Sequence, residues 1–522
     1  MPLFRRTILF LILLELLSLS SWLWPTLNTI CFGAILVIIF LLSFKNLAAG
    51  LLFALGELII GSHGYLFSLN LGQGASIISI RLGIFIIVLL AWALHTLRHE
   101  GFTGYWRRLK NFQFFKYYLF LAVVLAWGFF FALLRGNDFG NIFLDFNNWL
   151  FFLYLFPLLS ASRQEDFWPQ LRSVALACLA WLIVKTFLFF YIFSHQFIWA
   201  LPEFYRWIRD TRVGEITQFK GNFYRVFLQS QIYCLLAFFI FLPRVKKIFS
   251  QSYSLVLVSC LGVVLVSFSR SFWAGFVMGL FISVCLLVFS LRFLVADFRA
   301  GVKKFWTYLL NLVIICFASF VLIFIIAYAP PKADTDLIAS LGQRATEMEA
   351  AGSSRLSMLK PLLLAIVDHP VIGSGFGTTV TYQSSDPRVV PATAGGSGEY
   401  TTYAFEWGYL DLLLKIGLFG VFIYLLLIFK LLKALWQKVN FQITNPKSKI
   451  NLNGKSSKPI TSFELLVTSY SLPLGLLLAT IALLTVNIFT PYLNHPLGIG
   501  FILAVSVFLD YNQKLKIQAV IN

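Results

Sequence analysis

Three arginines stand in apolar surroundings where they could bind an anion. Arg270 is the only charge in VLVSFSRSFWAGF, between two apolar runs that must reverse direction within a few residues. Arg225 precedes another run in GNFYRVFLQSQ, and Arg355 opens RLSMLKPLLLAIV. A guanidinium presents a planar fork of N–H donors that fits phosphate oxygens, so these arginines predict a diphosphate site. The alternative interpretation is that their side chains extend to lipid headgroups.

Glu406 is the carboxylate that we predict as a general base. It lies in AFEWGYLDLLLKIGLFG, where a polar segment meets an apolar run, and partial desolvation at such a boundary makes a carboxylate a better proton acceptor. The competing interpretation is an acid that a helix N-terminus favours. His369, in VDHPVIGSGFG, is a second candidate for proton transfer, or else a residue that packs its loop.

Charged residues also fall inside the apolar runs. They are Glu15, Glu57, Arg81, Lys185, Asp411 and Lys415. Asp411 and Lys415 are four residues apart on one predicted helix, which favours an ion pair on one face. Glu57 and Arg81 are candidates to pair between two runs. In a transporter, such charges would instead form a coupling pathway.

The elements that carry these residues are apolar helices. Of 522 residues, 59% are hydrophobic and 12% charged, and the mean hydropathy is +0.83, which predicts an all-α integral membrane protein. We expect about fourteen transmembrane helices, at residues 7–24, 27–44, 47–66, 77–97, 117–134, 148–160, 172–194, 227–243, 253–269, 271–291, 307–328, 407–429, 464–486 and 494–511. The six cysteines fall in or beside these runs without a CxxC pair, so they predict packing residues and not disulfides or metal ligands.

The net charge of +19 comes from one side of the predicted membrane protein. Lys and Arg concentrate in the loops on the side of the N-terminus, as the positive-inside rule requires, and an even number of spans puts both termini there. This distribution explains the basic charge without a nucleic-acid partner. The sequence therefore predicts cytoplasmic N- and C-termini.

Four parts follow along the chain. Residues 1–200 hold the N-terminal helices, and 201–328 the central helices with outer loops that bear arginines. Residues 329–406 form one large outer loop, and 407–522 the C-terminal helices. In the last part, a basic linker at about 438–462 predicts disorder near anionic lipid.

The outer loops are expected to hold short helices. In the large loop we predict one that ends at Gly352 and a second, along the membrane, that begins after Ser354 and ends at residues 368–370. GSGFG and TAGGSGEY predict flexible backbone. Residues 195–226 alternate aromatic and charged side chains, which is typical of an interfacial helix or a loop folded onto the membrane.

The order of these features resembles the O-antigen ligase and polymerase superfamily. Arg225, the SRSFW turn, SRLSMLKPLLLAIVDHPVIGSGFG and EWGYLDLLLKIGLFG follow one another over about residues 220–425. Members of that superfamily are multi-pass proteins of the bacterial inner membrane, with a cytoplasmic N-terminus and one large periplasmic loop. They transfer a glycan from undecaprenyl diphosphate without a nucleotide or metal. The resemblance implies the same architecture here, with short helices in the periplasmic loop, and no cofactor.

One departure from the superfamily concerns the base. The ligase signature is a His followed by Asn, Ser or Gln, nine residues, Gly, two residues and Gly. Its spacing aligns with Glu406, Trp407, Gly417 and Gly420, so both glycines are present and Glu replaces His. A carboxylate can abstract the same proton, and the substitution favours a polymerase or exopolysaccharide version of the reaction over lipid A core ligation.

The resemblance also implies a mechanism and partners. Arg225, Arg270 and Arg355 would bind the diphosphate of an undecaprenyl-diphosphate-linked glycan and stabilise it as it leaves. Glu406 would deprotonate the attacking hydroxyl of a saccharide or glycolipid acceptor, and one direct displacement would invert the anomeric centre. Membrane lipids complete the expected partners.

A transporter or flippase of a lipid-linked saccharide is the alternative function. The charges within the membrane would then form a pathway, and the large loop would be a gate. Transporters often have two matching halves with interrupted spans, and this sequence shows no such repeat.

Overall fold

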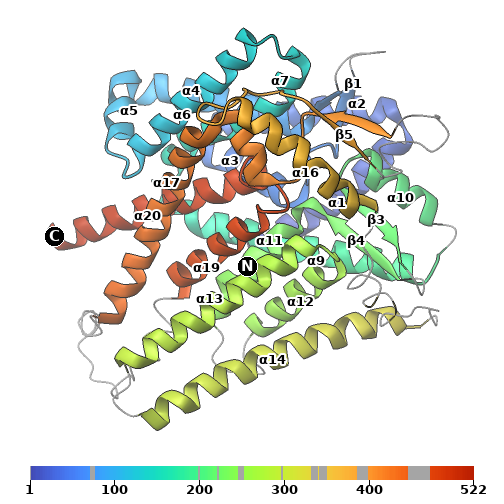
Figure 1. Ribbon diagram of the computed structural model, residues 1–522. Helices are drawn as coiled ribbons and strands as arrows, with labels where there is room; N and C mark the ends of the chain where they lie inside the picture. Colours follow the sequence, from blue (N-terminus) through green and yellow to red (C-terminus); the bar gives the residue numbers. More distant parts are fainter. Residues whose placement is uncertain are drawn as a thin grey trace.

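The computed structural model describes residues 2–70, 77–197, 200–219, 223–244, 252–294, 298–330, 339, 342, 350–384, 398–444 and 471–521 (Figure 1). These residues are mostly helical. The helices are α1 (Pro2–Leu23), α2 (Pro25–Lys45), α3 (Leu47–Ile60), α4 (Ile80–His99), α5 (Gly101–Lys110), α6 (Phe115–Leu134), α7 (Phe139–Phe146), α8 (Leu155–Ala161), α9 (Phe167–Ser194), α10 (Leu201–Asp210), α11 (Ile232–Phe241), α12 (Ser252–Val266), α13 (Arg270–Leu294), α14 (Phe298–Tyr328), α16 (Ala350–Asp368), α17 (Gly408–Thr444), α19 (Ser471–Val486) and α20 (Pro496–Ile521).

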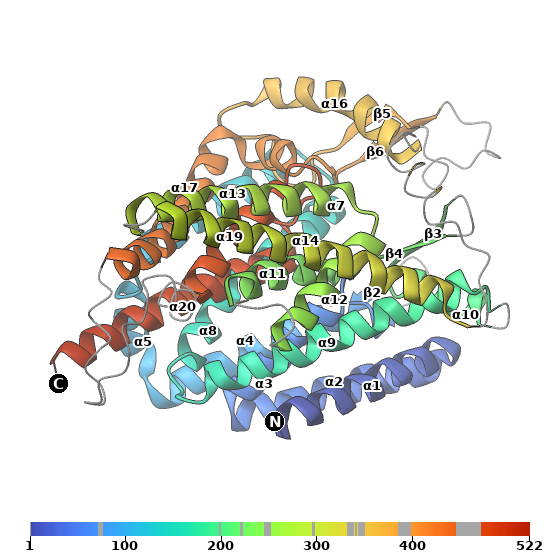
Figure 2. The ribbon, with the colours of Figure 1, turned by 90° about the horizontal axis from the view of Figure 1, so that it is seen from below.

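Short elements join these helices. Three 3-10 helices are η1 (Trp149–Tyr154), η3 (Gln229–Gln231) and η4 (Leu242–Arg244). The strands pair as antiparallel hairpins, β1 (Ser68–Asn70) with β2 (Ile77–Ser79), β3 (Gly214–Gln218) with β4 (Tyr224–Leu228), and β5 (Val380–Gln383) with β6 (Glu399–Thr402). The hairpins and α10 lie together at one end of the molecule, and the C-terminus lies at the other (Figure 2).

The core forms around helices that are apolar on every side. In α3, LAAGLLFALGELII leaves few residues exposed, and the helix packs against α2, α4 and α9. Asn46 starts it, because the Asn46 side chain accepts a hydrogen bond of 3.0 Å from the backbone N–H of Ala48. Most of the described side chains of α20 are buried in the same way.

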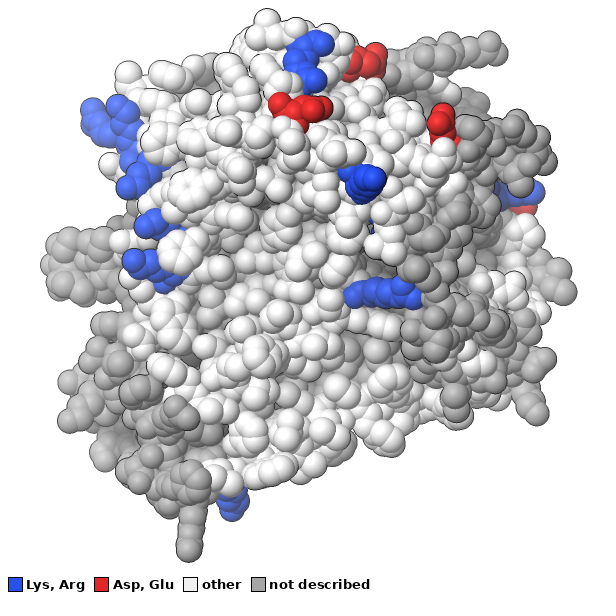
Figure 3. Space-filling model, in the orientation of Figure 1, with Lys and Arg blue, Asp and Glu red and all other residues white. Residues whose placement is uncertain are grey.

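Eight helices within the described residues are long and apolar enough to cross a membrane. They are Pro25–Lys45, Ile80–Arg98, Phe115–Leu134, Phe139–Ala161, Phe167–Ser194, Arg270–Phe289, Phe305–Tyr328 and Gly408–Asn440. Three shorter apolar helices accompany them, at Leu47–Ile60, Tyr253–Val266 and Leu472–Val486. On the face in Figure 3, Lys and Arg gather at the edge formed by α5, and most of the remaining surface is uncharged. The structure is therefore that of a multi-pass membrane protein.

The fourteen predicted apolar runs each overlap helical residues, but fourteen crossings and their orientation stay a prediction. The run at 148–160 is divided between η1 and α8. The three hairpins in the described residues were not expected from the sequence, and one of them, β3 with β4, follows α10 in the 195–226 segment. The predicted linker begins too early, because α17 continues to Thr444.

Two other predictions concern the large loop. The helix predicted along the membrane exists as α16 and ends at Asp368, and Leu363, Leu364 and Val367 on it are exposed. Gly352 does not end a preceding helix as predicted, because it lies within α16, which already begins at Ala350. The rest of that predicted helix and most of the TAGGSGEY segment lie outside the described residues.

The charges inside the apolar helices are paired. Arg81 Nε and Glu57 Oε2 are 2.8 Å apart, and Lys415 Nζ and Asp411 Oδ1 are 2.7 Å apart, which confirms both predicted pairs. Lys185 Nζ contacts Glu15 Oε1 at 2.6 Å. Each of these side chains is buried, so the pairs stabilise charges that would otherwise be costly in a membrane.

Candidate functional site

Arg225 and Arg270, which we call the arginine corner, lie on elements that contact one another at the end of the molecule with the hairpins. Arg225 lies on β4 opposite Thr217 of β3, and its Nε donates a hydrogen bond of 2.9 Å to the carbonyl oxygen of Ser267. Ser267 belongs to the turn between α12 and α13, and Arg270 is the first residue of α13. The structure therefore brings together two arginines that are far apart in sequence.

The turn that carries Arg270 is tightly built. Phe268 is buried and has a φ of 48°, which is unusual for a residue other than glycine. The Ser267 hydroxyl donates to the Val264 carbonyl at 2.6 Å and accepts from the Ser269 N–H at 3.3 Å. Such a turn fixes the start of α13, while the Arg270 side chain remains exposed. A cation held in this way is suited to binding an anion from solution.

Arg355 lies with Glu406 instead of joining this corner. The guanidinium of Arg355 forms an ion pair with the carboxylate of Glu406, and the Trp407 indole N–H donates to the Arg355 carbonyl at 3.1 Å. The two paired side chains are 40% and 49% exposed, respectively. Glu406 is therefore only partly desolvated, and its nearest cation is Arg355.

The loop of residues 487–495 connects these two groups. Phe489 packs against Trp407 with ring centroids 5.8 Å apart, and Thr490 Oγ1 donates to Ser271 Oγ at 3.0 Å. Trp407 follows Glu406, and Ser271 follows Arg270. The 487–495 loop, which we call the hub, therefore contacts the direct sequence neighbours of both Glu406 and Arg270. The only signal for this loop in the sequence is that NIFTPYLNHP is a polar interruption between two apolar runs.

His369 lies apart from Glu406. Its ring packs edge-on against Phe131 with centroids 5.7 Å apart, beside the kink of α17 at Gly417. The Leu418 N–H donates to the carbonyl of Pro370 at 2.9 Å, which fixes this segment to the kink. The first half of α17 separates the kink from Glu406 by about 13 Å of helical rise. The geometry of His369 agrees with the loop-packing interpretation.

GSGFG forms an ordered turn, and not the flexible backbone predicted from its glycines. Gly373, Gly375 and Gly377 all have positive φ. Asn137 Nδ2 donates to the Phe376 carbonyl at 2.9 Å and to Thr378 Oγ1 at 3.0 Å. Only glycine combines positive φ with close backbone packing at low cost, which is why the glycines produce order here.

A buried network joins this turn to the hub. Lys415 Nζ is 2.6 Å from Asp145 Oδ1 and also contacts Asp411. The Gly377 N–H donates to Asp145 Oδ2 at 2.9 Å, and Asn494 Nδ2 donates to Asp411 Oδ2 at 2.5 Å. The network fixes the turn, α17 and the 487–495 loop relative to one another.

Two histidines and an arginine form a second polar group beside the hub. His63 packs edge-on against His495 at 5.4 Å, and the guanidinium of Arg212 lies 4.6 Å from the centroid of Tyr65. Burial among the surrounding protein, followed by the charges of Arg81 and Arg212, lowers the pKa of His63 to about 4. The His63 residue is nevertheless accessible to solvent, whereas His495 is buried. No motif in the sequence marks these residues.

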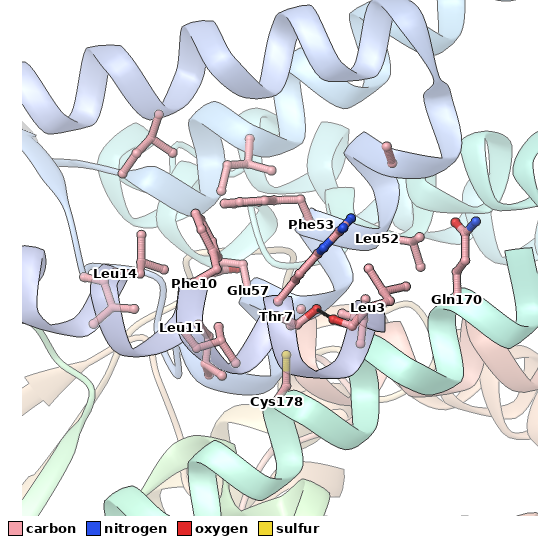
Figure 4. Close-up of a pocket in the computed structure, with 18 of the residues that line it drawn as sticks. Leu3, Thr7, Phe10, Leu11, Leu14, Leu52, Phe53, Glu57, Gln170 and Cys178 are labelled. Carbon is pink, nitrogen blue, oxygen red and sulfur yellow. Dashed lines mark hydrogen bonds between the residues drawn. The ribbon is translucent and has the colours of Figure 1, made fainter. Parts of the chain in front are cut away.

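A separate cavity of about 710 Å³ lies between α1, α3 and α9. It is lined mostly by apolar side chains, which point inward from these three helices (Figure 4). None of Arg225, Arg270, Arg355 or Glu406 lines it. The chemistry of the arginine corner therefore belongs to a different part of the molecule.

One comparison with known proteins gives a match. The family model described as O-antigen ligase matches residues 255–425. The matched segment runs from α12 to the part of α17 just after its kink and contains Arg270, Arg355, His369 and Glu406. No curated protein and no solved structure matches the chain.

Proposed function

We propose, from the match of residues 255–425 to the O-antigen ligase family model, that this chain is a membrane glycosyltransferase of the O-antigen ligase and polymerase superfamily. It transfers or polymerises a glycan from an undecaprenyl-diphosphate-linked donor onto a saccharide acceptor. The reaction takes place at the periplasmic face of the bacterial inner membrane, in O-antigen or exopolysaccharide synthesis. The observation that carries this proposal is the arrangement of Arg225, Arg270 and Glu406 around the 487–495 loop.

The arginine corner binds the diphosphate of the donor. The Ser267 carbonyl holds Arg225, and Arg270 begins the helix after the same turn, so this proposal places the diphosphate between two cations from two elements. Negative charge grows on the leaving diphosphate as the bond between the anomeric carbon and the phosphate oxygen breaks. Preorganised cations lower the energy of that state without having to reorganise, which is the usual source of large rate effects.

Glu406 accepts the proton of the acceptor hydroxyl. The hydroxyl oxygen attacks the anomeric carbon from the side opposite the diphosphate, the new glycosidic bond forms, and undecaprenyl diphosphate leaves with the bonding electron pair. This single displacement inverts the anomeric centre and requires no metal. Arg355 holds the Glu406 carboxylate in place, so in this proposal it is a positioning residue and not a diphosphate ligand.

Glu406 also bears on which branch of the superfamily the chain represents. Gly417 and Gly420 match the glycine spacing of the ligase signature, and both have structural reasons to be glycine. A Cβ at Gly417 would overlap the Val371 carbonyl, and one at Gly420 would press on Val124. Glu in place of the signature His favours a polymerase or exopolysaccharide enzyme over a lipid A core ligase.

The deciding experiment follows lipid-linked glycan and surface polysaccharide in a deletion strain. Complementation with Glu406→Gln or Arg270→Gln should lower polymer formation by about 10²-fold or more, because a base or a charge-stabilising donor is lost. The lipid-linked donor should then accumulate on the periplasmic face at normal protein level. Glu399→Gln and Arg209→Gln are matched controls, since both side chains lie outside the proposed machinery, and they should restore polymer.

Two results would oppose the proposal. Accumulation of the donor on the cytoplasmic face would indicate a flippase, the alternative in which the charges inside the membrane move substrate. Those charges are paired and buried, which supports structural roles for them. Normal polysaccharide in both site variants would reject the assignment of Glu406 and Arg270.

A further inference from the structure

The cavity between α1, α3 and α9 has no part in the proposed glycan transfer. Its volume is about 710 Å³. Leu11 and Leu14 of α1, Leu52 and Phe53 of α3 and Cys178 of α9 supply apolar walls (Figure 4). An apolar space of this size among membrane helices is suited to a hydrocarbon chain.

The cavity has a defined direction. Its lining on α1 begins at Pro2, whereas the other end of α1 lies at the hairpin end, where Trp22 Nε1 donates to Asp210 of α10 at 3.2 Å. Toward the hairpin end the lining is formed by Ile60, Phe67 and Ile80. The mouth with polar groups therefore lies at the start of α1, on the side of the molecule away from the arginine corner.

The depth of the cavity corresponds to one leaflet of a bilayer. Its lining on α3 runs from Ala49 to Ile60, which is about 16 Å of helical rise. The hydrocarbon core of a bilayer is about 30 Å thick, so a single acyl chain from the nearer leaflet would fill this length. A polyprenyl chain whose diphosphate lies at the arginine corner would have its head at the opposite end.

The mouth carries one cation and one anion. Arg6 and Asp166 both line it and are both exposed, and Gln170 lies beside them. A headgroup that contains a phosphate and an ammonium group would match these two charges, with the phosphate at Arg6 and the ammonium at Asp166. A headgroup with only negative charge would meet the Asp166 carboxylate as well.

We infer that this cavity binds one zwitterionic aminophospholipid of the ethanolamine type. One acyl chain lies between α1, α3 and α9, and the headgroup lies between Arg6 and Asp166. The deep end of the cavity includes Glu57, whose partner Arg81 donates to the Ser62 carbonyl at 2.7 Å. The bound lipid therefore packs beside the Glu57–Arg81 ion pair, and Arg81 in turn holds Ser62, the residue before His63.

The first experiment tests occupancy by the acyl chain. The full chain is purified in detergent, exchanged into vesicles of equal parts phosphatidylethanolamine and phosphatidylglycerol, re-extracted and washed, and its retained lipid is measured by mass spectrometry. Ala49→Phe fills the cavity, and Ala126→Phe on the exposed face of α6 is the matched control. We expect Ala49→Phe to retain at least fivefold less phosphatidylethanolamine than Ala126→Phe.

The second experiment tests the headgroup with adjacent pairs of like residues. Arg6→Gln and Asp166→Asn should each reduce the preference for phosphatidylethanolamine over phosphatidylglycerol. Arg5→Gln and Glu165→Gln should keep it, because neither Arg5 nor Glu165 lines the cavity. Thermal unfolding of every variant checks that it is folded. If Ala49→Phe does not fold, Ala49→Leu replaces it. Arg6→Lys combined with Asp166→Glu is a charge-preserving control, which should keep the preference for phosphatidylethanolamine.

Equal retention by Ala49→Phe and Ala126→Phe would overturn the inference, and so would a preference for phosphatidylglycerol or polyprenyl lipid in the wild type. These readouts measure bound lipid and not glycan transfer. They therefore remain decisive whether or not the proposed enzyme activity is correct.

Discussion

Individual residues in this protein take their roles from their partners more than from their types. Arg225, Arg270 and Arg355 are chemically alike, yet the first two share a corner and the third faces Glu406. Glu406 in turn is only half exposed, and its charge is balanced by Arg355. In the proposed site, Arg225 and Arg270 would therefore bind the substrate, and Arg355 would orient Glu406.

Arg355→Gln tests this separation by kinetics. If Arg355 only positions Glu406, kcat should fall about tenfold or more while KM for the lipid-linked donor stays close to wild type. Arg270→Gln should instead raise the KM for the donor, or lower both kcat and kcat/KM, because Arg270 is proposed to contact the diphosphate. Single-turnover assays with a defined donor in nanodiscs separate the two effects. A large rise in donor KM for Arg355→Gln would return Arg355 to the diphosphate site.

His63 gives a prediction about pH. Its pKa is about 4 in the folded protein, below the usual 6.5, so between these values the unfolded chain binds the proton more readily. The free energy of unfolding should therefore fall as the pH drops from about 6.5 toward 4. Burial also lowers the pKa of the neighbouring His495, so that histidine acts in the same direction. The melting temperature of His63→Gln should fall less than that of wild type over this range. Parallel curves for the two proteins would contradict the assignment.

At the scale of elements, the kink in α17 fixes the position of residues 370–373, which follow α16, relative to α17. Gly417 has φ 66° within an otherwise continuous helix, and the chain of residues 370–373 packs into the kink. The Leu418 and Phe419 N–H groups donate to the carbonyls of Pro370 and Val371. Helix periodicity predicted α17, but it could not predict that the helix would bend to admit another segment.

Gly417→Ala should therefore be destabilising. The substitution adds a Cβ at positive φ and against the Val371 carbonyl, and strained backbone of this kind costs about 1–3 kcal/mol. Thermal unfolding in detergent measures the effect. Gly33→Ala on α2 is the control, because nothing lies within 4 Å of its added Cβ, and it should be neutral or slightly stabilising. Equal melting temperatures for the two variants would show that the kink tolerates a side chain.

For the molecule as a whole, buried charges tie distant helices into one unit. Lys415 is 2% exposed and contacts Asp145 from α7 and Asp411 from its own helix. Asn494 extends this network to the 487–495 loop, which also contacts α13 and Trp407. The hub of the candidate site thus depends on contacts among the N-terminal, central and C-terminal helices.

Lys415→Met should destabilise the protein by about 3–5 kcal/mol, because it leaves two buried carboxylates without their cation. Lys433→Met removes an exposed lysine from the same helix and should change stability by less than about 0.5 kcal/mol. Thermal unfolding and the yield of folded protein provide the measurement. Combining Lys415→Met with Asp145→Asn and Asp411→Asn should recover much of the loss. No recovery would mean that the network does more than balance charge.

The sequence by itself determined the features that depend on near neighbours in the chain. Apolar runs predicted the helices, a spacing of four residues predicted the Asp411–Lys415 pair, and a tight turn between two runs placed Arg270 at a helix start. It also predicted α16 and its end at Asp368. Each of these follows from local hydrophobicity, periodicity or capping, for which a single stretch of sequence is sufficient.

Only the tertiary structure decided which of these residues meet. Arg225 and Ser267 are 42 positions apart, Arg355 and Trp407 are 52 apart, and Thr490 and Ser271 are 219 apart. His63 and His495 come from opposite ends of the chain. Such contacts depend on how whole helices pack, and helix packing is set by the summed shape of many side chains, so no local pattern in the sequence records it.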